Sequence, residues 1–347
     1  MFLSGKKEHF FRSRHMKSIK IVIAIVGIII FIIIGRKFQC NQVLLTNNVI
    51  REENRISIQR NLVIAAAMYT EITAMYRFVR SIRATCPFSA IVMIVAEYTT
   101  NDQDFKDLAN IYSVIYISHD EYFPAHLKKN KALVDSIYSG RWIIIRNYLS
   151  ILQSKNQAYD NIFICDAHDS LFQADIFTHI TDLTPGLYVF QENIYMNIGK
   201  CSLNCDWIRT CYNEAEVKKL SPNPIICSGT VLGTWKAIQV YLSVMESEIL
   251  KAPSNCTSFS GSDQGIHNYI IYNKKISNVA VHHISNEYGF VATLGYSLTI
   301  KRNQFGLVKN ENGTIYAVIH QWNRSQQLRS QFQREYQTIP ADAINKN

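Results

Sequence analysis

The interpretation of this chain rests on one stretch, Asn161-Ile162-Phe163-Ile164-Cys165-Asp166-Ala167-His168-Asp169. The stretch begins as a short apolar run, which is typical of a buried strand, and it ends in two carboxylates and an imidazole. Side chains of this kind can bind a divalent cation, and a cation at that position could hold a diphosphate. A strand that ends in an ordinary polar turn explains the same residues, because Asp favours turns. The stretch therefore leaves a metal-dependent enzyme and a structural turn as alternatives.

Strands and helices alternate on the N-terminal side of this stretch. Apolar runs predict strands over residues 62–67, 90–95 and 114–117, and apolar residues at helical spacing predict helices over 74–84, 104–111 and 142–152. Such alternation predicts an α/β fold with a mostly parallel central sheet, right-handed crossovers and flanking helices. Ligands bind in these folds at the carboxyl ends of the strands, which is where Asp166 and Asp169 lie.

An unbroken apolar segment occupies residues 21–35, between Lys20 and the pair Arg36-Lys37. It is shorter than the ~20 residues that usually cross a bilayer, but thin membranes of the early secretory pathway accept shorter spans. A cleaved signal peptide is the competing interpretation, yet the segment lacks a small-x-small cleavage site and a long N-terminal region precedes it. We therefore expect an uncleaved transmembrane signal anchor. The basic tail over 1–20 is expected in the cytosol and everything after the anchor in a lumen, because positive charge favours the cytosolic side.

The composition after the anchor is that of a stem followed by one large domain. Residues 36–60 are polar and show no apolar period, which is typical of a linker. We expect a luminal catalytic domain over 61–324 and a mobile polar tail over 325–347.

Positive charge is concentrated at the N-terminus. The net charge of the whole chain is +9, of which residues 1–37 carry +7, so that about +2 remains for the rest. A near-neutral domain argues against nucleic acid as a partner, since nucleic-acid binding needs a clustered basic face. Three N-glycosylation sequons, at Asn255, Asn312 and Asn323, agree with a luminal domain.

All eight cysteines follow the anchor, in a compartment that permits oxidation, so some disulfides are expected. Cys201, Cys205 and Cys211 form a cluster. A zinc site would need CxxC spacing or a nearby histidine, so local disulfides within the cluster are the favoured interpretation. Cys165 lies in the apolar strand and is expected to be a buried free thiol. Cys40, in the stem, could pair with a second copy of itself and give a homodimer.

Three further polar clusters lie within apolar sequence in the second half. Cys227-Ser228-Gly229 precedes a predicted helix over 235–250, and its small residues suit a strand-to-helix transition where backbone approaches a ligand. Asp263-Gln264-Gly265 opens another helix, with Ser262 as the expected N-cap and Asp263 at the positive end of the dipole. His320 lies in a predicted strand over 317–323. Each cluster also has a structural explanation, namely a plain turn, a helix cap and a buried histidine.

Taken in order, the four clusters resemble the motifs of GT-A fold glycosyltransferases of the secretory pathway, most closely those with a glycogenin-like layout. That family has a DxD-type element after a strand, an Asn/Cys-Ser-Gly segment, an Asp-Gln-Gly segment with an Asn soon after it (Asn268 here), and a late histidine. The resemblance spans residues 62–324. Two departures limit it: the first motif has the form DxHD, which leaves open whether His168 or Asp169 supplies the second ligand, and Cys227 stands where relatives have Asn.

The resemblance implies a metal-dependent transferase that moves a sugar from a UDP- or GDP-sugar to a glycan or glycoprotein, in the Golgi or ER membrane. The motif order suggests retention of anomeric configuration. Mn²⁺ or Mg²⁺ would be held by Asp166, His168, Asp169 and His320, the donor nucleotide and sugar by Ala66, Met68, Tyr69, Thr70, Ser228 and Gly229, and the catalytic residues would be Asp263 and Gln264.

Rival classes fit less well. A haloacid-dehalogenase phosphatase would place its Asp pair after the first strand, whereas three predicted strands precede Asp166. A sulfotransferase would need a basic phosphate loop after the first strand, and residues 65–69 contain no Lys or Arg. The remaining alternative is a catalytically inactive, membrane-tethered binding protein with the same fold, which the sequence does not distinguish from an enzyme.

Overall fold

The computed structural model describes residues 60–181, 184–296 and 299–335, all of which belong to one compact unit, Gln59–Asn347. The predicted cytosolic tail, the anchor and the stem up to residue 59, with Cys40, lie outside the described residues, as does the end of the polar tail. Within the described ranges, no helix has both the length and the hydropathy that a membrane span requires.

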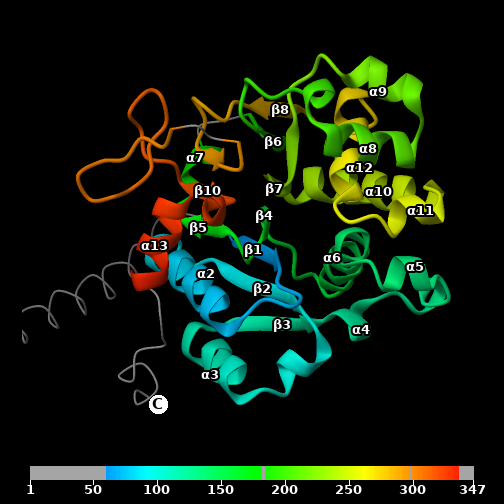
Figure 1. Cartoon of the computed structure of the whole chain (residues 1–347). Helices are drawn as coiled ribbons and strands as arrows, with labels where there is room; N and C mark the ends of the chain where they lie inside the picture. Colours follow the sequence, from blue (N-terminus) through cyan, green and yellow to red (C-terminus); the bar gives the residue numbers. More distant parts are fainter. Residues whose placement is uncertain (1–59, 182–183, 297–298, 336–347) are drawn as a thin grey trace, which may run out of the picture. The chain divides into compact units, whose positions relative to one another are not determined.

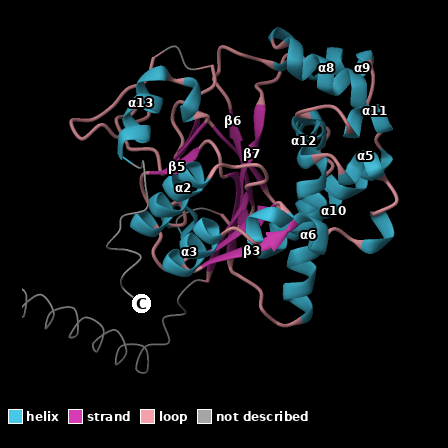
Figure 2. Ribbon diagram, turned by 60° about the horizontal axis from the view of Figure 1, so that its bottom comes forward, coloured by secondary structure: helices cyan, strands magenta, loops and turns pink. Residues whose placement is uncertain are grey.

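A seven-stranded sheet runs through the centre of this unit (Figure 2). Its order is β3-β2-β1-β4-β7-β6-β8, and the first four of these strands are mutually parallel. Strand β7 runs antiparallel to both of its neighbours, so it alone opposes the other six. The predicted α/β fold with a mostly parallel sheet is confirmed. The strands are β1 (Asn61–Ala66), β2 (Ala90–Val95), β3 (Val114–Ser118), β4 (Asn161–Asp166), β6 (Leu187–Gln191), β7 (Ile226–Thr234) and β8 (Val281–Ile284).

Helices cover both faces of the sheet (Figure 1). Helices α2 (Ile72–Thr85) and α3 (Gln103–Tyr112) pack on one face, and α6 (Ile137–Ser154), α10 (Trp235–Lys251) and α12 (Ser262–Tyr272) pack on the other. Shorter helices connect these elements: α4 (His119–Tyr122), α5 (Lys131–Val134), α7 (Thr178–Thr181), α8 (Ser202–Cys211), α9 (Glu214–Leu220) and α11 (Ser254–Thr257), with 3-10 turns at Glu97–Thr100, Ala125–Leu127, Ile198–Lys200 and Trp322–Arg324.

The two-sided cover explains why the central strands are apolar throughout. Successive residues of a strand point to opposite faces, so β1 buries Leu62 and Ile64 toward α6 and α10, and Val63 and Ala65 toward α2. Each fully buried Leu or Ile contributes about 1.5–3 kcal/mol. A strand without polar alternation is therefore stable only inside such a sandwich.

Helix α6 begins five residues earlier than predicted. Ser136 caps it, since its hydroxyl accepts a hydrogen bond from the Ser139 amide. The extra turn brings Arg141 into the helix, with consequences for the site.

A second sheet, β5-β10-β9, joins the C-terminal segment to the motif after β4. Strand β10 (Val318–His320) is antiparallel to β5 (Ser170–Phe172) and parallel to β9 (Val291–Thr293). Helix α13 (Gln326–Glu335) follows and buries Leu328 and Phe332 against the neighbouring apolar cluster. The first part of the predicted polar tail, residues 326–335, is therefore helical, and these two apolar residues on one helical face pack it against the domain.

Two local predictions also fail. Cys227-Ser228-Gly229 lies inside the nine-residue strand β7 and not at a strand-to-helix transition, because the strand continues to Thr234. Ser262 is the first helical residue of α12 and not its N-cap, a position that Gly261 takes with a φ of 78°. The short strands β5, β6, β8 and β9 were not predicted, since runs of three to five residues carry little periodicity.

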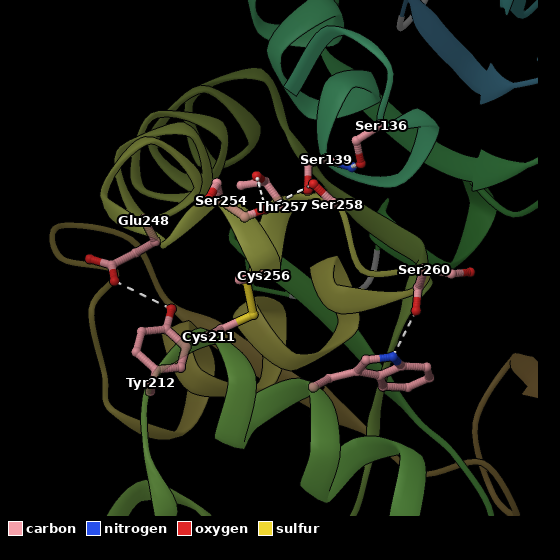
Figure 3. Close-up of a disulfide and its surroundings, with 11 residues drawn as sticks. Ser136, Ser139, Cys211, Tyr212, Glu248, Ser254, Cys256, Thr257, Ser258 and Ser260 are labelled. Atoms are coloured by element: carbon pink, nitrogen blue, oxygen red, sulfur yellow. Dashed lines mark hydrogen bonds between the residues drawn. A yellow bond between two sulfur atoms is a disulfide. The ribbon is translucent and has the colours of Figure 1, made fainter. Parts of the chain in front are cut away.

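One disulfide, Cys211–Cys256, joins the end of α8 to α11 (Figure 3). The expectation of disulfides is confirmed, but local pairing within the cysteine cluster is wrong, because Cys201 and Cys205 are free thiols. Cys165 is a buried free thiol, as predicted.

Replacing both Cys211 and Cys256 by Ser should lower the free energy of unfolding by up to about 4 kcal/mol, because the bond closes a loop with a sequence separation of 45. Chemical denaturation followed by circular dichroism measures the change. The double variant Cys201→Ser/Cys205→Ser is the matched control, since neither thiol is bridged. An equal loss in both double variants would contradict the prediction.

Candidate active site

A cavity of about 490 Å³ opens at the carboxyl ends of β1 and β4, and Ala66 and Asp166, which are paired in the sheet, line it. The chain runs from β1 through β2 to β3 on one side and then returns to β4 on the other. This reversal makes the gap between β1 and β4 a topological switch point, where open α/β sheets bind ligands.

Two carboxylates and one imidazole converge at this cavity. The Nε2 atom of His320 lies 3.2 Å from Oδ1 of Asp169 and 3.7 Å from Oδ2 of Asp166. One ligand atom from each residue lies within 4.8 Å of the others. Carboxylate oxygens suit Mn²⁺ or Mg²⁺, and an imidazole suits borderline ions of the first transition row, so the chemistry of the donor set agrees with a divalent cation.

Strand pairing brings His320 to this point across 151 residues of sequence. The residues after β4 form a tight turn, and Ser170 of β5 pairs directly with His320 of β10. Asp169, immediately before Ser170, is therefore held beside the imidazole. His168, one residue earlier in the turn, is exposed and does not belong to the group of three, although it lines the same cavity.

Cys227 fixes the other side of the imidazole. Its buried thiol lies 3.3 Å from Nδ1 of His320, so Nε2 is the ring nitrogen that faces the carboxylates. Burial alone would lower the pKa of His320, but Cys227 and the two carboxylates raise the pKa well above its ordinary value. The cysteine that departs from the family pattern thus orients a candidate ligand.

Gly229 is required by the close packing around this group. A Cβ at this position would lie 2.6 Å from Cε1 of His320 and 2.7 Å from Oδ2 of Asp166. Because Cys165 of β4 pairs with Thr230 of β7, the antiparallel register sets Gly229 beside Asp166. A side chain here would push the ligands apart.

Arg141 links the first motif to the third. Its guanidinium is buried and forms ion pairs with Asp166 and, at 2.5 Å, with Oδ2 of Asp263. The indole Nε1 of Trp142 donates to the same Asp263 oxygen at 3.1 Å. Burial opposes the charge on Arg141, but the two carboxylates raise its pKa further. Burial likewise acts to raise the pKa of Asp166, and Arg141 and His320 together lower it.

Both polar atoms of the Gln264 carboxamide are hydrogen-bonded within the protein. Its Oε1 accepts from the Ser228 amide at 2.7 Å and its Nε2 donates to Oε1 of Glu192 at 2.8 Å. Because a backbone N–H can only donate, the orientation of the carboxamide is fixed. Asn268, one turn later, bonds both backbone groups of Ile226 at 2.9 Å and ties α12 to β7. Burial raises the pKa of Glu192, and the bond from Gln264 lowers it in part.

All but one of the site residues predicted from the sequence line this cavity; the exception is Tyr69. Tyr69 is 70% exposed, has a φ of 59° in the turn after β1 and does not line the cavity. The predicted residues that do line it are Ala66, Met68, Thr70, Asp166, His168, Asp169, Ser228, Gly229, Asp263, Gln264 and His320.

Sequence reasoning missed three charged residues of the cavity, Arg141, Glu192 and Arg324. Glu192 directly follows the strand β6, and a carboxylate next to an apolar run is the same signal that identified Asp166 at the end of β4. Arg141 precedes an apolar helical run, and a lone cation in such a run is a sign of a buried ion pair.

No protein-family model matches the sequence, and no curated protein matches it. Among solved structures, the galactosyltransferase LgtC in complex with donor and acceptor sugar analogues is similar at 13% identity, with 81% of this chain and 98% of that chain covered and a TM-score of 0.44. An active-site mutant of LgtC is similar at 13% identity over the same shares, with a TM-score of 0.42. Likeness at these levels does not establish a shared activity.

Proposed function

We propose that the chain is a metal-dependent glycosyltransferase of the GT-A class, which moves a sugar from a UDP- or GDP-sugar to a glycan or glycoprotein acceptor. The observation that carries the proposal is the convergence of Asp166, Asp169 and His320 in one cavity with Asp263 and Gln264. These five residues come from β4 and the turn after it, from β10 and from α12, which only the fold brings together.

In this proposal Asp166, Asp169 and His320 hold a divalent cation. Bound there, Mn²⁺ or Mg²⁺ supplies Lewis-acid stabilisation for the charge on the departing diphosphate. Ala66, Met68 and Thr70, at the end of β1, line the part of the cavity assigned to the nucleotide.

Asp263 and Gln264 are assigned to the transferred sugar. Oδ2 of Asp263 accepts hydrogen bonds from Arg141 and Trp142, and the side chain is buried. We therefore assign Asp263 the role of positioning Arg141 and stabilising charge. Gln264, with its clamped carboxamide, presents a fixed polar group to the sugar. Retention of configuration is part of the proposal because the motif order suggests it.

The N-terminal segment completes the proposal. A signal anchor over 21–35 would place the domain in the Golgi or ER lumen as a type II membrane protein, with a stem between them. Cys40 in that stem could link two copies. A catalytically inactive binding protein would bind nucleotide without turning over its sugar.

Asp166→Asn and Asp169→Asn should each reduce Mn²⁺ affinity on the order of 100-fold or more, since even residues that only orient ligands account for 10–100-fold. Isothermal titration of the full-length chain with Mn²⁺, with hydrolysis of nucleotide sugars in parallel, measures the effect. Gly229→Ala retains all three ligands but should also lose Mn²⁺, because its Cβ would occupy their space. His168→Ala is the matched control. If His168→Ala lost Mn²⁺ affinity while Asp169→Asn bound Mn²⁺ normally, His168 and not Asp169 would be the ligand.

The Mn²⁺ affinity should rise with pH beyond ~6.5, the ordinary pKa of histidine. The pKa of His320 is raised in the metal-free protein, and Mn²⁺ must displace that proton to bind. The stability of the metal-free protein should change with pH in the opposite direction. The raised pKa of His320 stabilises the fold fully below ~6.5, and that contribution to the free energy of unfolding is lost as pH rises through the folded-state pKa. Titration and thermal unfolding over roughly pH 5 to 9 test both trends. In His320→Ala, both the Mn²⁺ affinity and the metal-free thermal stability should depend less on pH. If both dependences persist, His320 is not a ligand.

A tag at the C-terminus should be protected from protease in sealed microsomes if residues 21–35 are an uncleaved anchor. Asn255 and Asn312 are exposed and should then accept glycans, which a mobility shift after glycosidase treatment detects. A secreted product that begins near residue 38 would contradict the anchor.

A further inference from the structure

Helix α8 presents three side chains to the cavity that the proposed function does not use. Leu203, Asn204 and Trp207 all line the cavity, and their spacing places them on one face of the helix. Leu203 is 51% exposed, Trp207 is half-buried and Asn204 is 2% exposed. The face thus combines an exposed aliphatic group, an aromatic ring and a buried amide.

The ring of Trp207 is held in place before any ligand binds. Its Nε1 donates to the carbonyl of Ser260 at 2.7 Å. A Cβ at Gly261 would lie 2.6 Å from Cζ2 of the indole, and one at Gly265 would lie 2.8 Å from the Trp207 Cβ. Two glycines at the start of α12 therefore make room for this side chain. A ring fixed in this way costs little conformational entropy when it binds a ligand.

Asn204 has one polar group without a partner. Its Nδ2 donates to Sγ of Cys201 at 3.2 Å, and that sulfur also lies 3.3 Å from the hydroxyl of Tyr296. Its Oδ1 is buried and has no hydrogen-bond partner among the described residues. An unpaired buried acceptor costs about 1–3 kcal/mol, which a hydroxyl donated by a ligand would remove.

Contacts across the cavity relate the α8 face to the metal-binding group, Asp166, Asp169 and His320. Gly229 touches Asp166 and His320, and the neighbouring Ser228 bonds Gln264 in the first turn of α12. The same turn packs on Trp207 through Gly261. The first turn of α12, with Gln264, therefore connects the α8 face to the metal-binding group. If the diphosphate occupies the metal end and the transferred sugar lies at Gln264, the next sugar meets α8.

We propose that Leu203, Asn204 and Trp207 form the acceptor subsite and that it binds a neutral hexose of a glycan, an inference that rests on the proposed function. A hexose has an apolar C–H face, which would stack on Trp207 and contact Leu203, and hydroxyls at its edge, one of which would donate to Asn204. The three side chains carry no charge, so a neutral hexose matches this face; Glu192 and Arg324, which also line the cavity, are not part of it.

The test compares transfer with hydrolysis in the full-length chain. UDP-glucose, UDP-galactose and GDP-mannose serve as donors with Mn²⁺, and methyl glycosides of glucose, galactose and mannose as acceptors. Trp207→Ala should raise the acceptor KM at least tenfold and lower the ratio of transfer to hydrolysis by the same factor. Trp207→Phe, which retains a ring, should stay within threefold of the wild type. Leu203→Ala should lower the ratio too, while Leu250→Ala, a comparably exposed leucine on α10 outside the cavity, should not.

Direct binding separates failure of the subsite from failure of the proposed function. Saturation-transfer NMR should detect the methyl hexosides on the wild-type chain and lose them in Trp207→Ala and Asn204→Ala. Two results would overturn the subsite alone. One is a wild-type chain that binds nucleotide but no hexoside; the other is an equal loss of transfer and hydrolysis in folded Trp207→Ala and Leu203→Ala. A wild-type chain that binds no UDP or GDP with Mn²⁺ would overturn the proposed function, whereas hexoside binding that depends on Trp207 would still support the sugar site.

Discussion

The buried guanidinium of Arg141 is the interaction on which the rest of the site depends. It pairs with Asp166 at the end of β4 and with Asp263 in the first turn of α12, and so joins the two halves of the cavity. Removal of one partner from a buried ion pair costs about 3–5 kcal/mol, because the remaining charge is left without compensation. Asp263 is buried and Asp166 is half-buried, and the guanidinium of Arg141 compensates the charge of both.

The reversed direction of β7 is a second constraint. A parallel strand in this place would offer a different register to β4, whereas the antiparallel one sets Gly229 against the metal-binding group and Ser228 against Gln264. One strand thus contacts both the group assigned to the diphosphate and the residue assigned to the sugar. The small sheet adds the last element, because its pairing of β10 with β5 carries His320 to Asp169.

These constraints leave the cavity with two chemically different ends. One end gathers carboxylates and an imidazole and suits a cation with phosphate oxygens. The wall along α8 contributes no charged side chain to the cavity and offers an aromatic ring beside Oδ1 of Asn204, which has no partner among the described residues. The disulfide at the end of α8 ties this wall to α11, so the wall is supported by a covalent bond. A cavity with such ends is expected of an enzyme that joins a charged donor to a neutral acceptor.

The sequence by itself determined the layered fold, since buried strands such as β1 and β4 are apolar on both faces and therefore visible as continuous runs. It also marked Asp166, Asp263 and His320 as polar residues in apolar surroundings. Tertiary structure alone decided that Asp169 and not His168 lies beside Asp166 and His320, because the turn after β4 sends Asp169 toward β10 and His168 toward solvent. It also decided that Arg141 and Glu192 belong to the cavity and that Cys211 pairs with Cys256. The physical reason is common to all these cases: partners far apart in sequence have no local periodicity to reveal them, and only strand register and helix packing bring them into contact.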